Sequence, residues 1–174
     1  MTTQTLTDQS LTLRPWTADD AATIVECVDG DPELAKWLDQ VPQPYTLEDA
    51  RAYIAGLGEQ AFAVTDTRTG RILGSIGVQR NDDGVGEIGY WIRAHARGQG
   101  TMTCAVLLLA RWALTDGGLA RVQLRADIEN IASRRVAEKA GFQLEGVLRS
   151  AHWNPRLARR VDWAMYSLLP EDLV

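Results

Sequence analysis

Hydrophobic and polar residues alternate along some stretches of the chain and recur at helical spacing along others. Alternation at 61–65 and 72–78, joined by a polar turn at 66–71, predicts an antiparallel β-hairpin. Five more apolar stretches of strand length predict strands at 11–15, 87–92, 121–126, 142–148 and 161–168. We therefore expect about seven strands.

Helical spacing and capping residues predict helices between these strands. Thr17 and Asp20 form a capping pair for a helix that ends near Val28. Prolines within residues 41–45 exclude a regular helix there, and we expect this loop to face a substrate. Further helices are predicted from Asp31 onwards, from Thr46 to about Leu57, from about Gly100 to Thr115 and from about Ile131 to Ala140. This mixture indicates an α/β fold around a central sheet.

The stretch from Glu87 to Thr103 is an apolar strand pattern that runs into a glycine-rich turn and then into the long helix. Gly98 and Gly100 keep side chains away from the turn, and the unpaired amides at the start of a helix attract phosphates. A P-loop would need Gly-Lys-Ser/Thr, whereas this turn reads Gly-Thr-Met. A dinucleotide-binding turn would need a third glycine at position 103 and a place after the first strand. Neither class fits.

A third class of phosphate-binding turn matches these residues. Arg97-Gly98-Gln99-Gly100-Thr101-Met102 resembles the pyrophosphate loop of the GCN5-related N-acetyltransferases (GNAT), which usually reads Gln/Arg-x-x-Gly-x-Gly/Ala. Residues 130–146 resemble the second signature of this family, in the Rim-type branch that acetylates ribosomal-protein N-termini. The similarity runs from Leu11 to Leu169. Met102 replaces a glycine or alanine of most relatives, and Cys104 replaces a glutamate of many members of this branch.

The resemblance implies a GNAT-like fold over residues 1–174 as a single domain, with a mixed, mostly antiparallel central sheet flanked by helices and a flexible segment at 1–9. It also implies acetyl-CoA, or another acyl-CoA, as the donor. In relatives, two backbone amides and an asparagine contact the pantetheine arm, and a serine protonates the departing thiolate. The positions that correspond to the family's cofactor contacts are Ile92, Ala94, Arg97, Gly98, Gln99, Gly100, Thr101, Met102, Thr103, Asn130 and Ser133. Helix capping explains Asn130 and Ser133 equally well.

Removing a proton from the acceptor amine requires a base. An α-amino group with a pKa of about 8 costs roughly 1.4 kcal/mol to neutralise at pH 7, against about 4.6 kcal/mol for a lysine side chain. One modest base therefore suffices for a protein N-terminus. Glu87 is the candidate, because it lies on the strand that enters the turn and aligns with an acidic residue of the ribosomal branch. A solvent-facing glutamate explains it as well, and His95 is an alternative base.

Other residues are candidates for the acceptor site or for the core. Tyr45 in the proline loop, and His152 and Trp153 in a loop predicted at 150–155, are candidates for contact with the acceptor. We expect Trp37, Trp91, Trp112 and Trp163 in the core. Cys104 lies in a helix that looks buried, so packing explains it better than a role as nucleophile.

Net charge, cysteine count and hydropathy limit the classes of partner and the compartment that we expect. The net charge is −5 and the pI is near 5.0, which argues against nucleic acid. Two cysteines are too few for a disulfide framework and should be reduced, and no metal site is expected. The chain shows no leader pattern and no apolar run long enough to cross a membrane, so the cytoplasm is the expected compartment.

We therefore predict an N-acyltransferase that moves acetyl from acetyl-CoA to a primary amine by direct attack in a ternary complex, with a protein N-terminal α-amino group favoured as acceptor. A small amine or an antibiotic is an alternative acceptor, and a succinyl or other acyl group is an alternative cargo. A non-catalytic sensor of acyl-CoA is an answer of a different class. A homodimer is common among similar proteins and is one option for the assembly.

Overall fold

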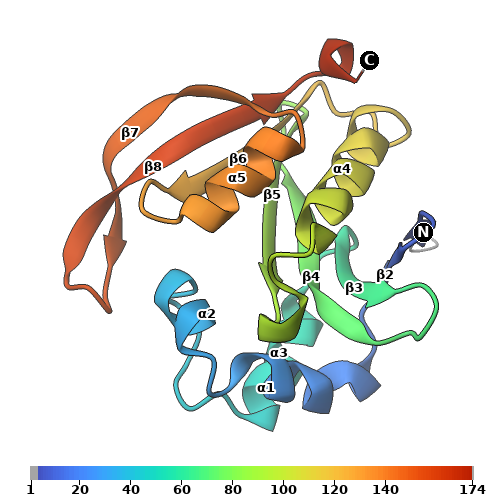
Figure 1. Cartoon of the computed structure of the whole chain (residues 1–174), viewed down its shortest axis with the longest axis vertical. Coiled ribbons are helices and arrows are strands. Elements are labelled where there is room, and N and C mark those ends of the chain that lie inside the picture. The colour runs from blue at the N-terminus through green and yellow to red at the C-terminus, as the bar shows by residue number, and fades with distance from the viewer. Residues whose placement is uncertain (1–3, 174) are drawn as a thin grey trace. The chain divides into compact units, whose positions relative to one another are not determined.

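The computed structural model describes residues 4–173 (Figure 1). Contacts within the chain divide it into two compact units. The N-terminal unit contains the described residues up to Gly77 together with Tyr90–Thr101. The C-terminal unit contains Val78–Gly89 and the described residues from Met102 onwards. Strands β4 (Ile72–Arg80) and β5 (Val85–Ile92) run through both units.

The described residues form one open mixed sheet of eight strands, in the order β1-β2-β3-β4-β5-β6-β8-β7. This confirms the predicted α/β fold, with one strand more than expected. The additional strand is β1 (Leu6–Thr7), which pairs antiparallel with β2 (Leu11–Pro15). The structure therefore differs from the predicted flexible segment at Leu6 and Thr7, while residues 1–3 of that segment lie outside the described part of the chain. The expectation of a single domain stays a prediction.

In the N-terminal unit, β2 and β3 pair antiparallel, as do β3 and β4, which confirms the predicted hairpin. The helices follow the predicted capping residues. The backbone N–H of Thr17 donates to the Asp20 carboxylate at 2.8 Å, and that of Thr46 donates to Asp49 at 2.8 Å. The elements of this unit besides β1, β2 and β4 are η1 (Ala18–Asp20), α1 (Ala21–Val28), α2 (Pro32–Trp37), α3 (Leu47–Gly56), β3 (Ala61–Asp66) and η2 (Ala94–Ala96).

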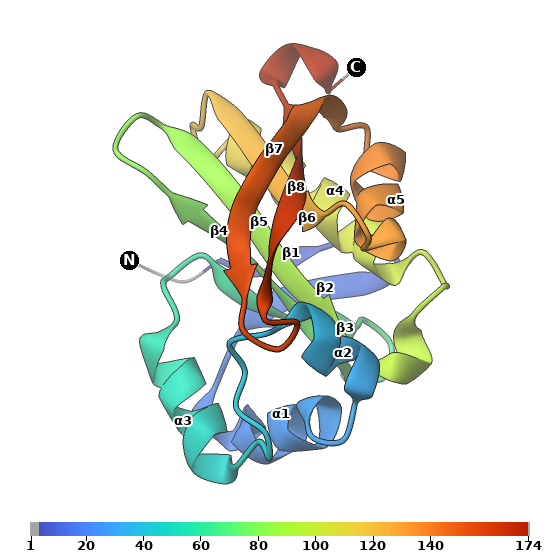
Figure 2. The same cartoon turned by 90° about the vertical axis from the view of Figure 1, so that its left-hand side faces the viewer.

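In the C-terminal unit, β5 pairs parallel with β6 (Arg121–Asp127), and β6 pairs antiparallel with β8 (Arg159–Leu168). Figure 2 shows β7 (Gln143–Asn154) beside β8, with which it pairs antiparallel. Alternate residues of β6 are buried, so one face of the strand packs in a core and the other carries polar side chains. The remaining elements are α4 (Thr101–Leu114), α5 (Ile131–Lys139) and η3 (Pro170–Asp172).

Two expectations about this unit are wrong. Residues 150–154, predicted as loop, belong to β7, because the pairing with β8 resumes at His152 after a register shift. Helix α4 has a solvent-facing side, so Cys104 is exposed rather than buried. The apolar face of this helix is instead formed by residues such as Ala105 and Leu109, which are fully buried.

The backbone of β4 passes so close to β5 at Gly74 that a Cβ atom there would lie 2.3 Å from the carbonyl oxygen of Trp91. We predict that Gly74→Ala lowers the free energy of unfolding by about 1–3 kcal/mol, because a backbone atom cannot move aside as a flexible side chain can. Gly58→Ala is the matched control, since a Cβ there meets nothing within 4 Å. Urea unfolding measures both variants, and equal stabilities would contradict the close approach.

Candidate active site

The glycine-rich turn has the backbone that an anion cradle requires. Gly98 and Gly100 adopt φ values of +73° and +79°, which favour glycine, and a Cβ at either position would meet nothing within 4 Å. Helix α4 begins at Thr101, directly after the turn. The first amides of a helix have no partner within the helix, so those of residues 101–103 are available to an anion. The turn predicted from the sequence therefore has an open backbone at the positive end of a helix.

Arg97 is held by groups that the sequence did not connect with it. Its guanidinium donates to the Asp31 carboxylate at 2.5 Å and to the carbonyl oxygen of Ile92 at 3.2 Å. Asp31 also accepts from the backbone N–H of Leu34 at 3.0 Å, as the N-cap of α2. Burial alone would raise the pKa of Asp31, but the hydrogen bonds from Arg97 and Leu34 hold it below its usual value. Arg97 therefore ties the turn to α2, and its contact with a phosphate stays a prediction.

Hydrogen bonds of Arg93 and Gln99 fix the chain just before the turn and within it. The backbone N–H of Arg93 donates to Leu73 at 2.9 Å, and its guanidinium donates to Ile72 at 3.0 Å. The Gln99 amide donates to the carbonyl oxygen of His95 at 2.7 Å. Slight burial, together with the positive charges of Arg93 and Arg71, lowers the pKa of the exposed His95. The contact with the His95 carbonyl gives the Gln99 side chain a structural role in the turn, while the imidazole of His95 lies exposed.

Asn130 and Ser133 form the capping arrangement that the sequence allowed. The side-chain oxygen of Asn130 accepts from the backbone N–H of Ser133 at 3.0 Å, at the start of α5. This bond uses the carbonyl of the Asn130 amide, so its NH₂ group is the part that could donate to a ligand. Ser133 is half-buried. The capping role is confirmed, and contact of both residues with a cofactor stays a prediction.

Glu87 belongs to a row of side chains in the C-terminal unit. Its carboxylate forms an ion pair with Arg125, whose Nε donates at 2.9 Å, and it accepts from the Gln123 amide at 3.0 Å. The Arg125 guanidinium lies 4.5 Å from the centre of the Trp163 ring. His152 stacks on the same Trp163 ring, with the two ring centres 5.0 Å apart. We call Glu87, Arg125, Trp163 and His152 the Glu87–His152 row.

The structure brings Glu87 and His152 into one row but leaves Trp153 outside it. Trp153 faces solvent on β7, with 52% of its surface exposed. Among the tryptophans expected in the core, Trp91 is buried. The other three, Trp37, Trp112 and Trp163, are half-buried. Sequence reasoning missed Arg125 and Gln123, and the only signal for them was their spacing on one face of β6.

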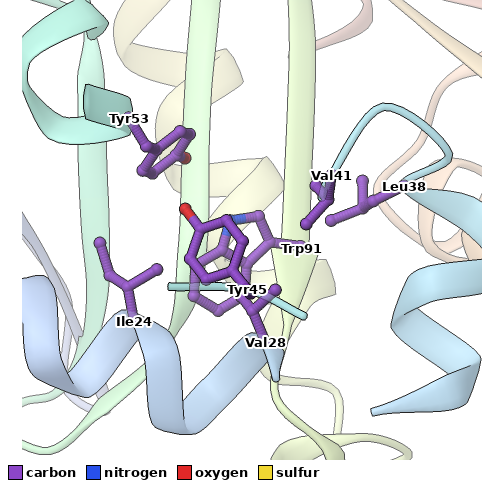
Figure 3. A pocket seen from close by; sticks show the side chains of 7 residues that line it. All are labelled: Ile24, Val28, Leu38, Val41, Tyr45, Tyr53 and Trp91. Atoms are coloured by element: carbon purple, nitrogen blue, oxygen red, sulfur yellow. The ribbon is translucent and has the colours of Figure 1, made fainter. Parts of the chain in front are cut away.

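Tyr45 lies in an apolar pocket of the N-terminal unit rather than on the surface of its loop. Burial, with smaller effects of Tyr53 and Asp49, raises the pKa of its hydroxyl to about 12. Its backbone N–H donates to Asp29 at 3.1 Å. The pocket is a cavity of about 140 Å³, and Figure 3 shows the side chains around Tyr45 that line it. These are Ile24, Val28, Leu38, Val41, Tyr53 and Trp91.

No group of three or more histidine, cysteine, aspartate or glutamate side chains within residues 4–173 could hold a metal ion. Over the same residues, no helix is both long enough and apolar enough to cross a membrane.

Comparisons with known proteins identify the family. Residues 10–143 match the acetyltransferase (GNAT) domain family. The uncharacterized N-acetyltransferase p20 of Bacillus licheniformis is 28% identical over 97% of this chain and 98% of its own length. The ribosomal-protein-serine acetyltransferase of Escherichia coli is 36% identical over 38% of this chain and 37% of its own length. A crystal structure of a GNAT-family acetyltransferase from Bacillus anthracis covers 97% of this chain and 99% of its own, with a TM-score of 0.88 at 21% identity.

The open turn, the helix that follows it and the mixed sheet are therefore those of a GNAT enzyme. The chain belongs to the acetyltransferase (GNAT) domain family, and it is an N-acetyltransferase. The resemblance found in the sequence, including that to the Rim-type branch, is confirmed.

If Arg97 acts by tying the turn to α2, its partner matters as much as Arg97 itself. We predict that Arg97→Ala and Asp31→Asn both weaken the binding of coenzyme A, each by about tenfold, since a lost charge-assisted hydrogen bond costs roughly 1.5 kcal/mol. Isothermal titration calorimetry measures both dissociation constants. If Arg97 instead contacts phosphate directly, Asp31→Asn frees its charge and binding stays equal or becomes tighter, which would overturn the tie.

Proposed function

We propose that this N-acetyltransferase transfers acetyl from acetyl-CoA to a primary amine, and that a protein N-terminal α-amino group is its acceptor. The observation that carries the proposal is the open glycine turn at the head of α4, in a chain that belongs to this family. Donor and acceptor bind together, and the neutral amine attacks the thioester carbon directly. The C–N bond forms, the C–S bond breaks, and coenzyme A leaves as the thiol.

The residues of the turn suit the diphosphate of acetyl-CoA. Side chains are absent at Gly98 and Gly100, so the backbone can approach the phosphates, and the amides of residues 98–103 would receive them. The hydroxyls of Thr101 and Thr103 are further donors. Amides near Ile92 and Ala94 would pair with the pantetheine arm and polarise the thioester carbonyl. The sheet supports this role, because the register of β5 with β6 extends to Glu87↔Gln123, several residues before Ile92. Strand β6 continues to Asp127 in its pairing with β8.

Glu87 is the proposed base. A carboxylate has about four acceptor positions, and the contacts of Arg125 and Gln123 use three of them, two on Oε1 and one on Oε2. The remaining position on Oε2 would take the ammonium proton, directly or through a water. The donors from β6 would hold the carboxylate in one orientation, so that its free lone pair keeps a fixed direction. Arg125 and Gln123 are therefore positioning residues.

Ser133 is the proposed partner of the leaving group. A serine hydroxyl is too weak an acid to ionise, so it would donate a hydrogen bond to the sulfur or relay a proton to it. Its backbone N–H is bound to Asn130, which fixes the start of α5. This tie would hold the hydroxyl at a constant place while the thiol departs.

Two arguments support a protein N-terminus as the acceptor: the name of a relative and the pKa of an α-amino group. The E. coli relative is named as an enzyme that acts on a ribosomal protein, which supports a protein acceptor. An α-amino group also requires less of the base than a lysine side chain does. A homodimer belongs to the same proposal. Large apolar side chains exposed on β7, such as Leu144, Val147 and Leu148, support it, and light scattering that shows a monomer at all concentrations would reject it.

The reaction can be followed by the release of thiol from acetyl-CoA with a panel of peptides and small amines. We predict that Glu87→Gln and Ser133→Ala each lower kcat, by about a hundredfold or more for Glu87→Gln, because positioned proton transfer is worth roughly 10²–10⁴ in rate. The matched control is Glu145→Gln, since Glu145 is also paired with an arginine, Arg121, in the C-terminal unit. Unchanged turnover in both variants would contradict the assigned roles. Binding of coenzyme A without turnover of any amine would show a sensor instead of this acetyltransfer.

A further inference from the structure

The apolar pocket around Tyr45 is a defined cavity whose walls come from distant parts of the N-terminal unit. Ile24 and Val28 lie on α1, Tyr53 on α3 and Trp91 on β5, while Leu38 and Val41 come from the segment after α2 (Figure 3). Trp16 packs behind this wall, with its ring centre 6.4 Å from that of Tyr53 and 6.3 Å from that of Trp91. Aromatic packing therefore supports the wall formed by Tyr53 and Trp91, while Leu38 and Val41 form a rim outside the helices.

The chemistry of the walls selects an uncharged, apolar group. None of the seven lining side chains carries a charge, because burial keeps the Tyr45 hydroxyl protonated at ordinary pH. The Tyr53 hydroxyl is already bonded to Ser75 at 2.9 Å. A cavity of about 140 Å³ is close to the roughly 150 Å³ apolar cavity that accommodates benzene in another protein. It would therefore hold a branched or aromatic group of about four to seven carbon atoms.

The chain around the uncharged pocket is rich in acidic residues. Residues 29–49, the stretch that supplies Leu38, Val41 and Tyr45 to the pocket, contain six carboxylates, of which Asp31 is paired with Arg97, and a single basic residue, Lys36. The carboxylates are Asp29, Asp31, Glu33, Asp39, Glu48 and Asp49. Such a surface attracts a cation by Coulomb interaction before it binds. A ligand with an ammonium group outside the pocket and a hydrocarbon group inside would match both regions.

The pocket also lies beside the proposed place of reaction. Trp91 lines the pocket and is followed directly by Ile92, whose backbone amide is the one we assign to the thioester end of acetyl-CoA. Neighbouring residues of a strand are about 3.3 Å apart. An amine that reaches the thioester there has its own side chain within a few ångströms of Trp91, which is the span from an α-amino group to the end of a leucine side chain.

We infer that this pocket binds the side chain of the first residue of the acceptor, and that the enzyme prefers N-termini that begin with leucine, methionine or phenylalanine. The inference rests on the proposed function and names its substrate class. Polyamines and aminoglycosides would be drawn to the acidic rim as well, but they have no apolar group to place in the cavity. The pocket thus separates a hydrophobic N-terminus from these small amines.

Peptides that differ only in their first residue test the preference. With acetyl-CoA as donor, kcat/KM for thiol release should be at least about tenfold higher for Leu, Met and Phe than for Ala, Ser and Asp, because the extra carbon atoms leave water. Equal values across the series would overturn the pocket and leave the acetyltransfer standing. Acetylation of none of the peptides would overturn both. A preference for long acyl-CoA donors in place of acetyl-CoA would assign the pocket to the acyl chain and overturn the inference.

Variants that fill the cavity test the residues. Val41→Phe at the rim and Val28→Phe in the wall each add volume where the side chain of the peptide would lie. Both should reduce the preference for Leu over Ala, measured as the ratio of kcat/KM for the two peptides, to less than about threefold. Ala22→Phe adds the same ring on the exposed side of α1 and is the matched control. Circular dichroism and thermal unfolding establish that each variant is folded. A preference retained in both folded variants would contradict the inference.

Discussion

The ion pair between Arg97 and Asp31 is the contact on which the arrangement of the N-terminal unit depends. It joins the start of the glycine turn to the residue from which the chain leads through α2 to the pocket rim. Asp31 caps α2 with the same carboxylate, so one side chain serves the helix and the turn together. A second bond from Arg97 to the carbonyl oxygen of Ile92 fixes the strand end from which the turn leaves. The proposed sites for the donor and for the acceptor side chain are thereby tied to the same pair of charges.

The C-terminal unit holds its polar groups by a different principle. The Glu87–His152 row crosses β5, β6, β8 and β7, and its members contact one another by an ion pair, a cation-π contact and ring stacking. An arginine over a tryptophan ring has little freedom to leave its carboxylate partner. This arrangement gives Glu87 a fixed direction without burying it, which suits a base that has to meet an amine from solution.

Local pattern was sufficient for most of the fold. The hairpin of β3 and β4, the capping pairs at Thr17 and Thr46 and the glycine turn before α4 all follow from residues within a few positions of each other. Strand β7 was predicted too short because its pairing with β8 shifts register between Leu148 and His152, and no pattern within residues 149–154 shows that the pairing resumes. Strand β1 has only two residues, which is too few for a period to be seen.

The partners of the candidate residues could not be predicted, because they depend on which strands and helices become neighbours. Arg125 is 38 residues from Glu87, and Asp31 is 66 residues from Arg97. Only the register of β5 with β6 places the former pair together, and no pattern within either strand specifies that register. The same holds for Tyr45, whose proline loop predicted a contact with substrate but not that its side chain would face into a cavity.

In the proposed function, the turn formed by residues 97–103 binds the diphosphate of coenzyme A. Calorimetric titrations with three ligands test this binding: coenzyme A, pantetheine and 3′-phosphoadenosine 5′-phosphate. Pantetheine lacks the diphosphate and the nucleotide, and 3′-phosphoadenosine 5′-phosphate is a nucleotide without the diphosphate link. Coenzyme A should bind at least about a hundredfold more tightly than either fragment, and Gly100→Val, which adds a branched side chain at a left-handed φ, should abolish that difference. Equal affinities for coenzyme A and pantetheine, or full affinity in the Gly100→Val variant, would contradict it.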